Sequence, residues 1–234
     1  MSIKSFLRRK IYAVERRTVP KVKLQHKLDS MVGPFGYWDR LQQYQFNLLK
    51  TFGLQPHHQL LDIGCGPLQG GLAFIKYLNP NCYVGIDLRE RVIEEANLQI
   101  MRERLVEKKP ILLVADDFGE KFIKRKFDYI WASQMLYHLD EHKIDSLFQF
   151  VSGVLIETGM FLCDIIGYPN KVGHESEWSG FKFHLHTVDF INRTAEKYGL
   201  IAESLGAIEQ YGYPSEISLK TNILFKISKR HIGP

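Results

Sequence analysis

The sequence has few cysteines and no apolar stretch long enough to cross a membrane. Its 234 residues include 3 cysteines, an odd and sparse set that argues against the disulfide framework of small secreted proteins. No uninterrupted apolar run approaches the roughly 18 residues that a membrane-spanning helix needs. The N-terminus lacks the apolar core and small-residue cleavage site of a secretory signal. We therefore expect a reduced, cytoplasmic protein.

Positive charge is concentrated at the N-terminus. Residues 1–27 hold nine Lys and Arg against one acid, Glu15, in a chain whose net charge is +5. Apolar residues recur in this segment at helical spacing, which predicts an amphipathic helix. We expect a basic helical segment over residues 1–32, followed by one domain over residues 33–234. The segment could pack over a pocket of the domain or against a second subunit, or it could contact an acidic membrane, nucleic acid or an acidic carrier.

Short apolar runs alternate with amphipathic stretches through most of the chain. Helices are predicted over residues 38–52, 69–78, 89–107, 140–156 and 187–198, and strands over residues 59–63, 82–86, 110–114, 127–132, 159–166, 200–206 and 221–228. This alternation is typical of a parallel sheet with helices on both faces. Only a loop separates the last two strands, which allows an antiparallel pair at the end of the sheet.

The most informative segment is a glycine-rich turn between a predicted strand and a predicted helix. Residues 60–71 read LLDIGCGPLQGG, and the next strand ends at Asp87, 21 positions after Gly66. Glycine lets the backbone turn tightly and approach a ligand closely. A carboxylate at the tip of the second strand can accept hydrogen bonds from both hydroxyls of a ribose. The pattern predicts a site for a cofactor that contains a nucleoside.

The residues around the turn distinguish between two kinds of nucleoside cofactor. The dinucleotide pattern needs a third glycine where this chain has Gln69. Asp62 would repel a pyrophosphate but suits a ligand that carries ammonium and sulfonium groups, as S-adenosyl-L-methionine does. The DIGCG turn, with Asp87 downstream, resembles motifs I and II of the class I S-adenosylmethionine-dependent methyltransferases.

This resemblance implies a fold and a set of cofactor contacts. The fold would be a Rossmann-like α/β sheet of seven mostly parallel strands, with helices on both faces and an antiparallel last strand, and residues 33–234 would form the methyltransferase domain. The ends of the first four strands would hold the cofactor through Asp62, Gly64, Cys65, Gly66, Asp87, Leu88, Asp116, Asp117 and Ser133. The resemblance assigns Asp87 to the ribose, although it could instead cap the following helix. It assigns Asp116 or Asp117 to the adenine amino group, with Asp116 favoured.

The end of the fourth strand bears on the methyl acceptor. Ser133-Gln134-Met135-Leu136 stands there, where methyltransferases acting on DNA amino groups carry Asn or Asp followed by Pro-Pro and an aromatic residue. A flipped base is therefore disfavoured as the acceptor. His138 follows at a place where many small-molecule methyltransferases carry a histidine. It could remove a proton from a hydroxyl acceptor, or it could be a packing or capping residue.

The loop between the fifth strand and the next helix, residues 167–187, is rich in histidine and aromatic residues. It contains His174, His184 and His186, which could orient or deprotonate an acceptor under a lid that excludes water. The loop could equally be an ordinary lid without proton transfer. Its histidine and glutamate spacing matches no zinc pattern, so no metal is expected.

These observations predict a methyltransferase that acts on a small molecule or specialised metabolite, with oxygen as the favoured acceptor atom. The candidate catalytic residues are His138, His184 and His186. One alternative is an RNA or protein methyltransferase that recruits its substrate through the basic N-terminus. Another is an NAD(P)-binding oxidoreductase or a non-catalytic nucleoside-binding domain. Nucleic acid is disfavoured as a partner, while peripheral membrane contact through residues 1–27 and a homodimer stay open.

Overall fold

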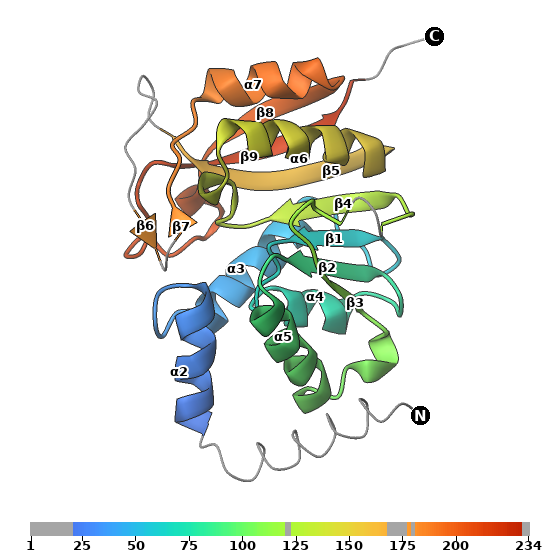
Figure 1. Ribbon diagram of the computed structural model, residues 1–234, viewed down its shortest axis with the longest axis vertical. Helices are drawn as coiled ribbons and strands as arrows, with labels where there is room; N and C mark the ends of the chain where they lie inside the picture. The colour runs from blue at the N-terminus through green and yellow to red at the C-terminus, as the bar shows by residue number, and fades with distance from the viewer. Residues whose placement is uncertain (1–20, 120–122, 168–176, 179–180, 231–234) are drawn as a thin grey trace.

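A seven-stranded sheet forms the centre of the computed structural model, which describes residues 21–119, 123–167, 177–178 and 181–230 (Figure 1). In spatial order the strands are β3 (Ile111–Val114), β2 (Tyr83–Asp87), β1 (Leu60–Ile63), β4 (Phe127–Ala132), β5 (Leu155–Ile166), β9 (Asn222–Lys229) and β8 (Leu200–Ala207). Strands β1 to β5 pair in parallel, whereas β9 is antiparallel to both β5 and β8. The predicted Rossmann-like sheet, with its antiparallel ending, is confirmed.

Helices cover both faces of the sheet because its central strands are apolar on both sides. Leu60 packs in a cluster with residues of α3 (Trp38–Thr51), α4 (Gly71–Tyr77) and α5 (Glu90–Arg102). The next residue, Leu61, packs in a second cluster with residues of α6 (Glu141–Val154) and α7 (Val188–Lys197). Adjacent residues of β1 thus pack in opposite clusters, one on each face of the sheet.

Two predicted elements differ from the structure by more than two residues at one end. Helix α5 stops at Arg102 instead of residue 107, because Arg104 takes a left-handed backbone conformation with φ of 60° and a short 3-10 helix, η1 (Val106–Lys108), follows. Strand β5 begins at Leu155 instead of residue 159, because Leu155 already pairs with Phe127 of β4 before a shift in register.

Helix α2 (Lys21–Val32) is the described part of the predicted basic segment, and the amphipathic helix expected before it lies outside the described residues. The Nζ of Lys27 lies 2.5 Å from the buried carboxylate of Glu95 in α5. The backbone N–H of Gly36 donates to Asp29 over 2.9 Å, and Asp29 is 3% exposed. These contacts hold α2 and the turn that follows it against the domain.

The region between β5 and α7 contains a short antiparallel pair, β6 (Glu177–Trp178) and β7 (Phe181–Lys182), where only a loop was expected. His174 lies outside the described residues. Two 3-10 helices complete the fold: η2 (Leu136–His138) follows β4, and η3 (Ile208–Tyr211) follows β8. In the part of the chain that the structure describes, no helix is long and apolar enough to span a membrane.

Candidate functional site

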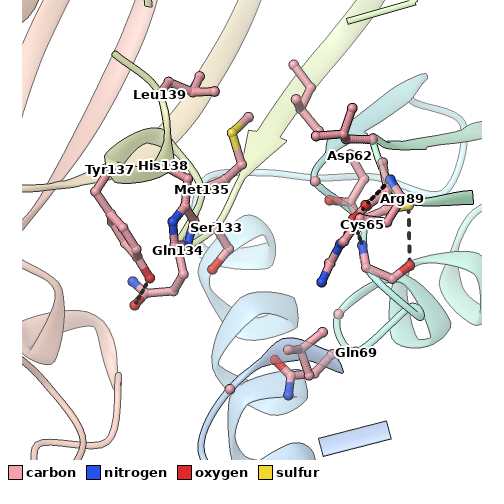
Figure 2. A pocket seen from close by; sticks show the side chains of 18 of the residues that line it. Asp62, Cys65, Gln69, Arg89, Ser133, Gln134, Met135, Tyr137, His138 and Leu139 are labelled. Atoms are coloured by element: carbon pink, nitrogen blue, oxygen red, sulfur yellow. Dashed lines mark hydrogen bonds and ion pairs between the residues drawn. The ribbon is translucent and has the colours of Figure 1, made fainter. Parts of the chain in front are cut away.

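A cavity of about 580 Å³ lies at the carboxyl ends of the parallel strands. Its wall includes residues that follow β1, β2, β3 and β4, together with the turn after α2 and residues near β7 and η3. Figure 2 shows Asp62, Cys65 and Arg89 on one side and Gln134, Tyr137 and His138 on the other. Open α/β sheets bind their ligands at this edge.

The glycine-rich turn brings backbone to the cavity wall. Gly64 and Gly66 have φ of 74° and 56°, in the left-handed region that favours glycine. The backbone N–H groups of Gly64 and Cys65 both donate to the carbonyl of Ile86, over 2.8 and 3.0 Å. A Cβ added at Gly64 would lie 2.8 Å from Cγ of Met135. Glycine is therefore required at Gly64 both by the backbone and by the opposite wall.

Asp62 places a carboxylate on the cavity wall although it is only 4% exposed. Burial raises the pKa of Asp62 to about 7, a hydrogen bond from Tyr83 lowers it, and the charge of Asp87 raises it. The hydroxyl of Tyr83 donates to Oδ2 of Asp62 over 2.6 Å. A cationic group in the cavity would stabilise the ionised form of Asp62.

Asp87 joins the second strand to the glycine-rich turn. Its Oδ2 accepts a hydrogen bond from the backbone N–H of Gly66 over 3.1 Å, and its Oδ1 accepts one from the backbone N–H of Arg89 over 2.9 Å. The Arg89 guanidinium also pairs with the carboxylate, with Nε 3.1 Å from Oδ1. The Asp87 carboxylate thus both lines the cavity and organises the backbone around it.

The other predicted cofactor residues divide into two groups. Cys65, Leu88, Asp116 and Ser133 line the cavity. Leu88 is 56% exposed, so it offers an apolar surface beside Asp87. Asp117 does not appear in the cavity wall, and its Oδ1 instead accepts a hydrogen bond from the backbone N–H of Gly119 over 3.1 Å.

His138 lines the cavity from η2. Its ring packs against Tyr137 and Phe183, with centroids 4.6 and 5.1 Å away. Burial lowers the pKa of His138 to about 4, against the opposing effect of a hydrogen bond to the backbone of Lys182. The imidazole beside the cavity is therefore neutral at physiological pH.

His184 and His186 occupy different environments. His184 lines the cavity, and its backbone N–H donates to the carbonyl of Tyr137 over 2.7 Å. His186 is 3% exposed, and its Nε2 lies 2.9 Å from the carbonyl oxygen of Leu139. Burial lowers the pKa of His186. His186 is not part of the cavity wall. Its hydrogen bond to Leu139 connects the segment before α7 to the residue after η2.

A buried hydrogen-bond network beside η2 was not identified from the sequence. Asp164, in β5, is fully buried and accepts from the backbone N–H and the Nε2 of Gln134 over 2.7 and 2.5 Å. The hydroxyls of Tyr137 and Tyr213 each donate to Oε1 of Gln134 over 3.2 Å. An acid within the apolar run FLCDII was the one available signal in the sequence.

No metal site is apparent among the described residues. They contain no group of three or more His, Cys, Asp and Glu side chains that could hold a metal ion. The described groups that line the cavity include carboxylates, imidazoles and phenols.

Comparison with known proteins places part of the chain in a recognised family. Residues 61–161 match a family model described as a methyltransferase domain. Geranyl diphosphate 2-C-methyltransferase from Saccharopolyspora erythraea is 28% identical over 136 residues, which cover 55% of this chain and 46% of that protein. The chain thus matches about half the length of this curated relative.

Solved structures with the same fold cover most of the chain. An S-adenosylmethionine-dependent methyltransferase from Clostridium acetobutylicum has a TM-score of 0.59 at 18% identity, covering 82% of this chain and 92% of its own. Magnesium protoporphyrin IX methyltransferase from Synechocystis, solved with S-adenosylmethionine bound, has a TM-score of 0.58 at 11% identity and covers 98% of both chains. At these identities the similarity establishes the fold.

Proposed function

We propose that this chain, which carries a class I S-adenosylmethionine-dependent methyltransferase domain, transfers a methyl group to a small-molecule acceptor whose accepting atom is oxygen. The observation that carries the proposal is the composition of one cavity. A glycine-rich turn and two carboxylates lie on one side, and imidazole and phenol groups lie on the other (Figure 2). The first set suits the methyl donor and the second set suits a polar acceptor.

The residues after β1 and β2 fit S-adenosylmethionine. Burial raises the pKa of Asp62, so a cationic ligand would stabilise its ionised form. Asp87 offers carboxylate oxygens for a ribose, Leu88 offers an apolar surface for adenine, and Asp116 offers an acceptor for its amino group. When bound, S-adenosylmethionine supplies a methyl group on a positively charged sulfur, already activated for displacement.

The opposite wall has to orient the acceptor. Holding a nucleophile in line with its target can contribute ~7 to 11 kcal/mol to catalysis. A hydroxyl also loses its proton on methylation, and His138 is our candidate to take it, with His184 on the same wall. Because the pKa of His138 is about 4, it is a weak base. This favours a hydroxyl of low pKa, such as a phenol or an enol.

A small-molecule acceptor agrees with the cavity and with the relatives. The turn after α2 and the segment around His184 both contribute to the wall, so the cavity is bounded on more sides than the sheet edge alone. The names of two relatives specify geranyl diphosphate and magnesium protoporphyrin IX, both of which are small molecules. A polymer substrate would depend on the basic residues 1–27, of which residues 1–20 lie outside the described part of the chain. A cytoplasmic location is part of the same proposal.

Two experiments test the proposal. Calorimetric titration with S-adenosylmethionine, S-adenosylhomocysteine, NAD and NADP should show saturable binding of the two sulfur nucleosides, lost in Asp87→Ala. Binding of the dinucleotides alone would contradict it. An acceptor screen with a ¹³C-methyl donor then identifies the methylated atom by NMR. Labelled O-methyl products support oxygen as the acceptor atom, whereas N- or C-methyl products would show that this assignment is wrong.

A further inference from the structure

Four side chains form a polar platform at the acceptor side of the cavity. The platform consists of Gln134, Tyr137, Asp164 and Tyr213. Gln134 follows β4 and Tyr137 lies in η2, whereas Asp164 lies in β5 and Tyr213 follows η3. Gln134, Tyr137 and Tyr213 line the cavity, and Asp164 lies beneath them, fully buried. The platform is built from parts of the chain up to 79 residues apart.

The buried carboxylate fixes which way the Gln134 amide faces. An ionised carboxylate only accepts hydrogen bonds, so Asp164 must face the NH₂ group of Gln134, 2.5 Å away. The backbone N–H of Gln134 donates to the other Asp164 oxygen over 2.7 Å. Gln134 has φ of 52°, an uncommon conformation for a residue with a side chain. Together these contacts turn Oε1 of Gln134 toward the two tyrosines.

The direction of these hydrogen bonds determines what the tyrosines can still do. Oε1 of Gln134 carries no proton, so Tyr137 and Tyr213 must both donate to it. A phenol has a single proton, so each hydroxyl oxygen can then only accept further hydrogen bonds. Burial raises the pKa of both groups, so they stay protonated. The platform therefore presents acceptors, and no donor, from its two phenols.

We propose that Tyr137 and Tyr213 determine acceptor specificity by taking hydrogen bonds from an O–H or N–H donor on the small molecule. This inference rests on the proposed function, since it describes the substrate of the same cavity. A molecule with an ether or ester oxygen at that place would face two acceptor oxygens and be rejected. Asp164 is a positioning residue, because it acts only by orienting Gln134.

Asp164→Asn should reverse the preference for a hydrogen-bond donor over an ether or ester oxygen, instead of merely weakening it. The backbone N–H of Gln134 keeps the carbonyl of the new amide in place, so its NH₂ replaces Oδ2 and faces Gln134. The Gln134 amide must then turn over and donate to both tyrosines, which frees their protons toward the cavity. Asn222, which now donates to Oδ2 of Asp164 over 3.3 Å and has a buried Oδ1 without a hydrogen-bond partner among the described residues, can turn its amide to match.

The test compares two probes of similar shape, phenol and anisole, on the full chain saturated with S-adenosylhomocysteine. Dissociation constants are measured by ligand-observed NMR. We expect phenol to bind on the order of tenfold more tightly than anisole, because a buried acceptor left unpaired is costly. Tyr213→Phe and Tyr137→Phe should each reduce this ratio, and Asp164→Asn should move it below one. Tyr211→Phe is the control, since its hydroxyl donates to the carbonyl of Leu205 and is not in the cavity wall.

Three results would overturn the platform's role: equal affinity for both probes, failure of both to bind, or a ratio that Tyr213→Phe leaves unchanged. Each variant is first required to bind S-adenosylhomocysteine as the wild type does, which separates a misfolded variant from a changed specificity. The same titration separates the two proposals. If the wild type does not bind S-adenosylhomocysteine, the proposed function is refuted. The ratio of the phenol and anisole affinities tests the platform alone.

Discussion

The Asp87 carboxylate and the Arg89 guanidinium form an ion pair at the cavity wall, 3.1 Å apart. The same guanidinium donates to the carbonyl of Met31 at the end of α2 over 2.9 Å. One arginine thus connects the tip of β2 to the helix that precedes the domain. A ribose that binds Asp87 has to share the carboxylate with this guanidinium.

Replacing Asp87 should weaken binding of the methyl donor and loosen the glycine-rich turn. Asp87→Ala removes the acceptor for the Gly66 N–H and the partner of Arg89. We expect the affinity for S-adenosylhomocysteine to fall by roughly tenfold or more, because hydrogen bonds to charged groups contribute ~1.5–3 kcal/mol. Calorimetry measures this change in affinity. Glu94→Ala, an exposed acid on α5, is the matched control, and an equal effect of both substitutions would refute the assignment.

Asp62 should make cofactor binding depend on pH. Its pKa is about 7 in the free protein, mainly because of burial, and a nearby cationic group, such as the ammonium of S-adenosylhomocysteine, would lower it. Binding therefore favours the ionised form, so the affinity for S-adenosylhomocysteine should rise as the pH increases from about 6 to about 8. Asp62→Asn should bind more weakly and lose this dependence. An affinity that is constant across this range in the wild type would show that Asp62 does not face the ligand's charge.

Asp62 and Asp164 should each contribute stability to the ligand-free protein that is lost as the pH rises from about 4 to about 7. Burial raises the pKa of Asp62 to about 7 and of Asp164 to about 6, from 3.8. Between pH 3.8 and the raised pKa of each group, the folded state binds more protons than the unfolded state, so deprotonation favours unfolding. Urea unfolding at pH 5 and pH 8 measures the difference. The double variant Asp62→Asn, Asp164→Asn should show a smaller one, and an unchanged difference would contradict the prediction.

His138 and His186 should separate catalysis from folding. His138→Ala should reduce turnover by ~10² or more if the imidazole accepts the proton, while binding of S-adenosylhomocysteine is retained. His186→Ala should lower the free energy of unfolding by ~1–3 kcal/mol, because the Leu139 carbonyl loses its partner. Steady-state kinetics and thermal unfolding distinguish the two effects. Full turnover in His138→Ala would show that the base assignment is wrong.

Gly64→Ala should disrupt the site without a change in charge. At φ of 74° an alanine costs ~1–2 kcal/mol, and its Cβ would also lie 2.8 Å from Cγ of Met135. We expect a lower unfolding temperature and weaker cofactor binding. Gly153→Ala is the comparison, because Gly153 lies in α6 and an added Cβ there would meet no other side chain of the described residues within 4 Å. It should be neutral or stabilising, since alanine is the better helix former.

The sheet was predictable because its signal is local. Each parallel strand is a short apolar run, and each intervening helix repeats apolar residues at helical spacing, as in β1 and α5. The glycine-rich turn and Asp87 were predictable for the same reason, since each sits at a strand end that the sequence marks. The ends of α5 and β5 were not, because they depend on a left-handed Arg104 and on pairing with β4.

The acceptor side could not be predicted because its contacts are not local. Tyr213 joins Gln134 across 79 residues, and no spacing rule relates the two. The burial of Asp164 follows from the placement of β9 between β5 and β8, which strand prediction alone does not supply. The difference between Asp116, which lines the cavity, and Asp117, which accepts from the Gly119 backbone, likewise depends on the conformation of the loop after β3.

The turn after α2 has a consequence for protein engineering. Met31 and Val32 lie on one side of the predicted boundary at residue 32, Gly33 and Pro34 lie on the other, and all four line the cavity. A protein expressed from residue 33 onward would therefore lack part of the pocket, and Arg89 would lose the carbonyl it binds. Residue 32 is therefore not a boundary between two independent modules of this chain, because residues on both sides of it form one wall of the cavity.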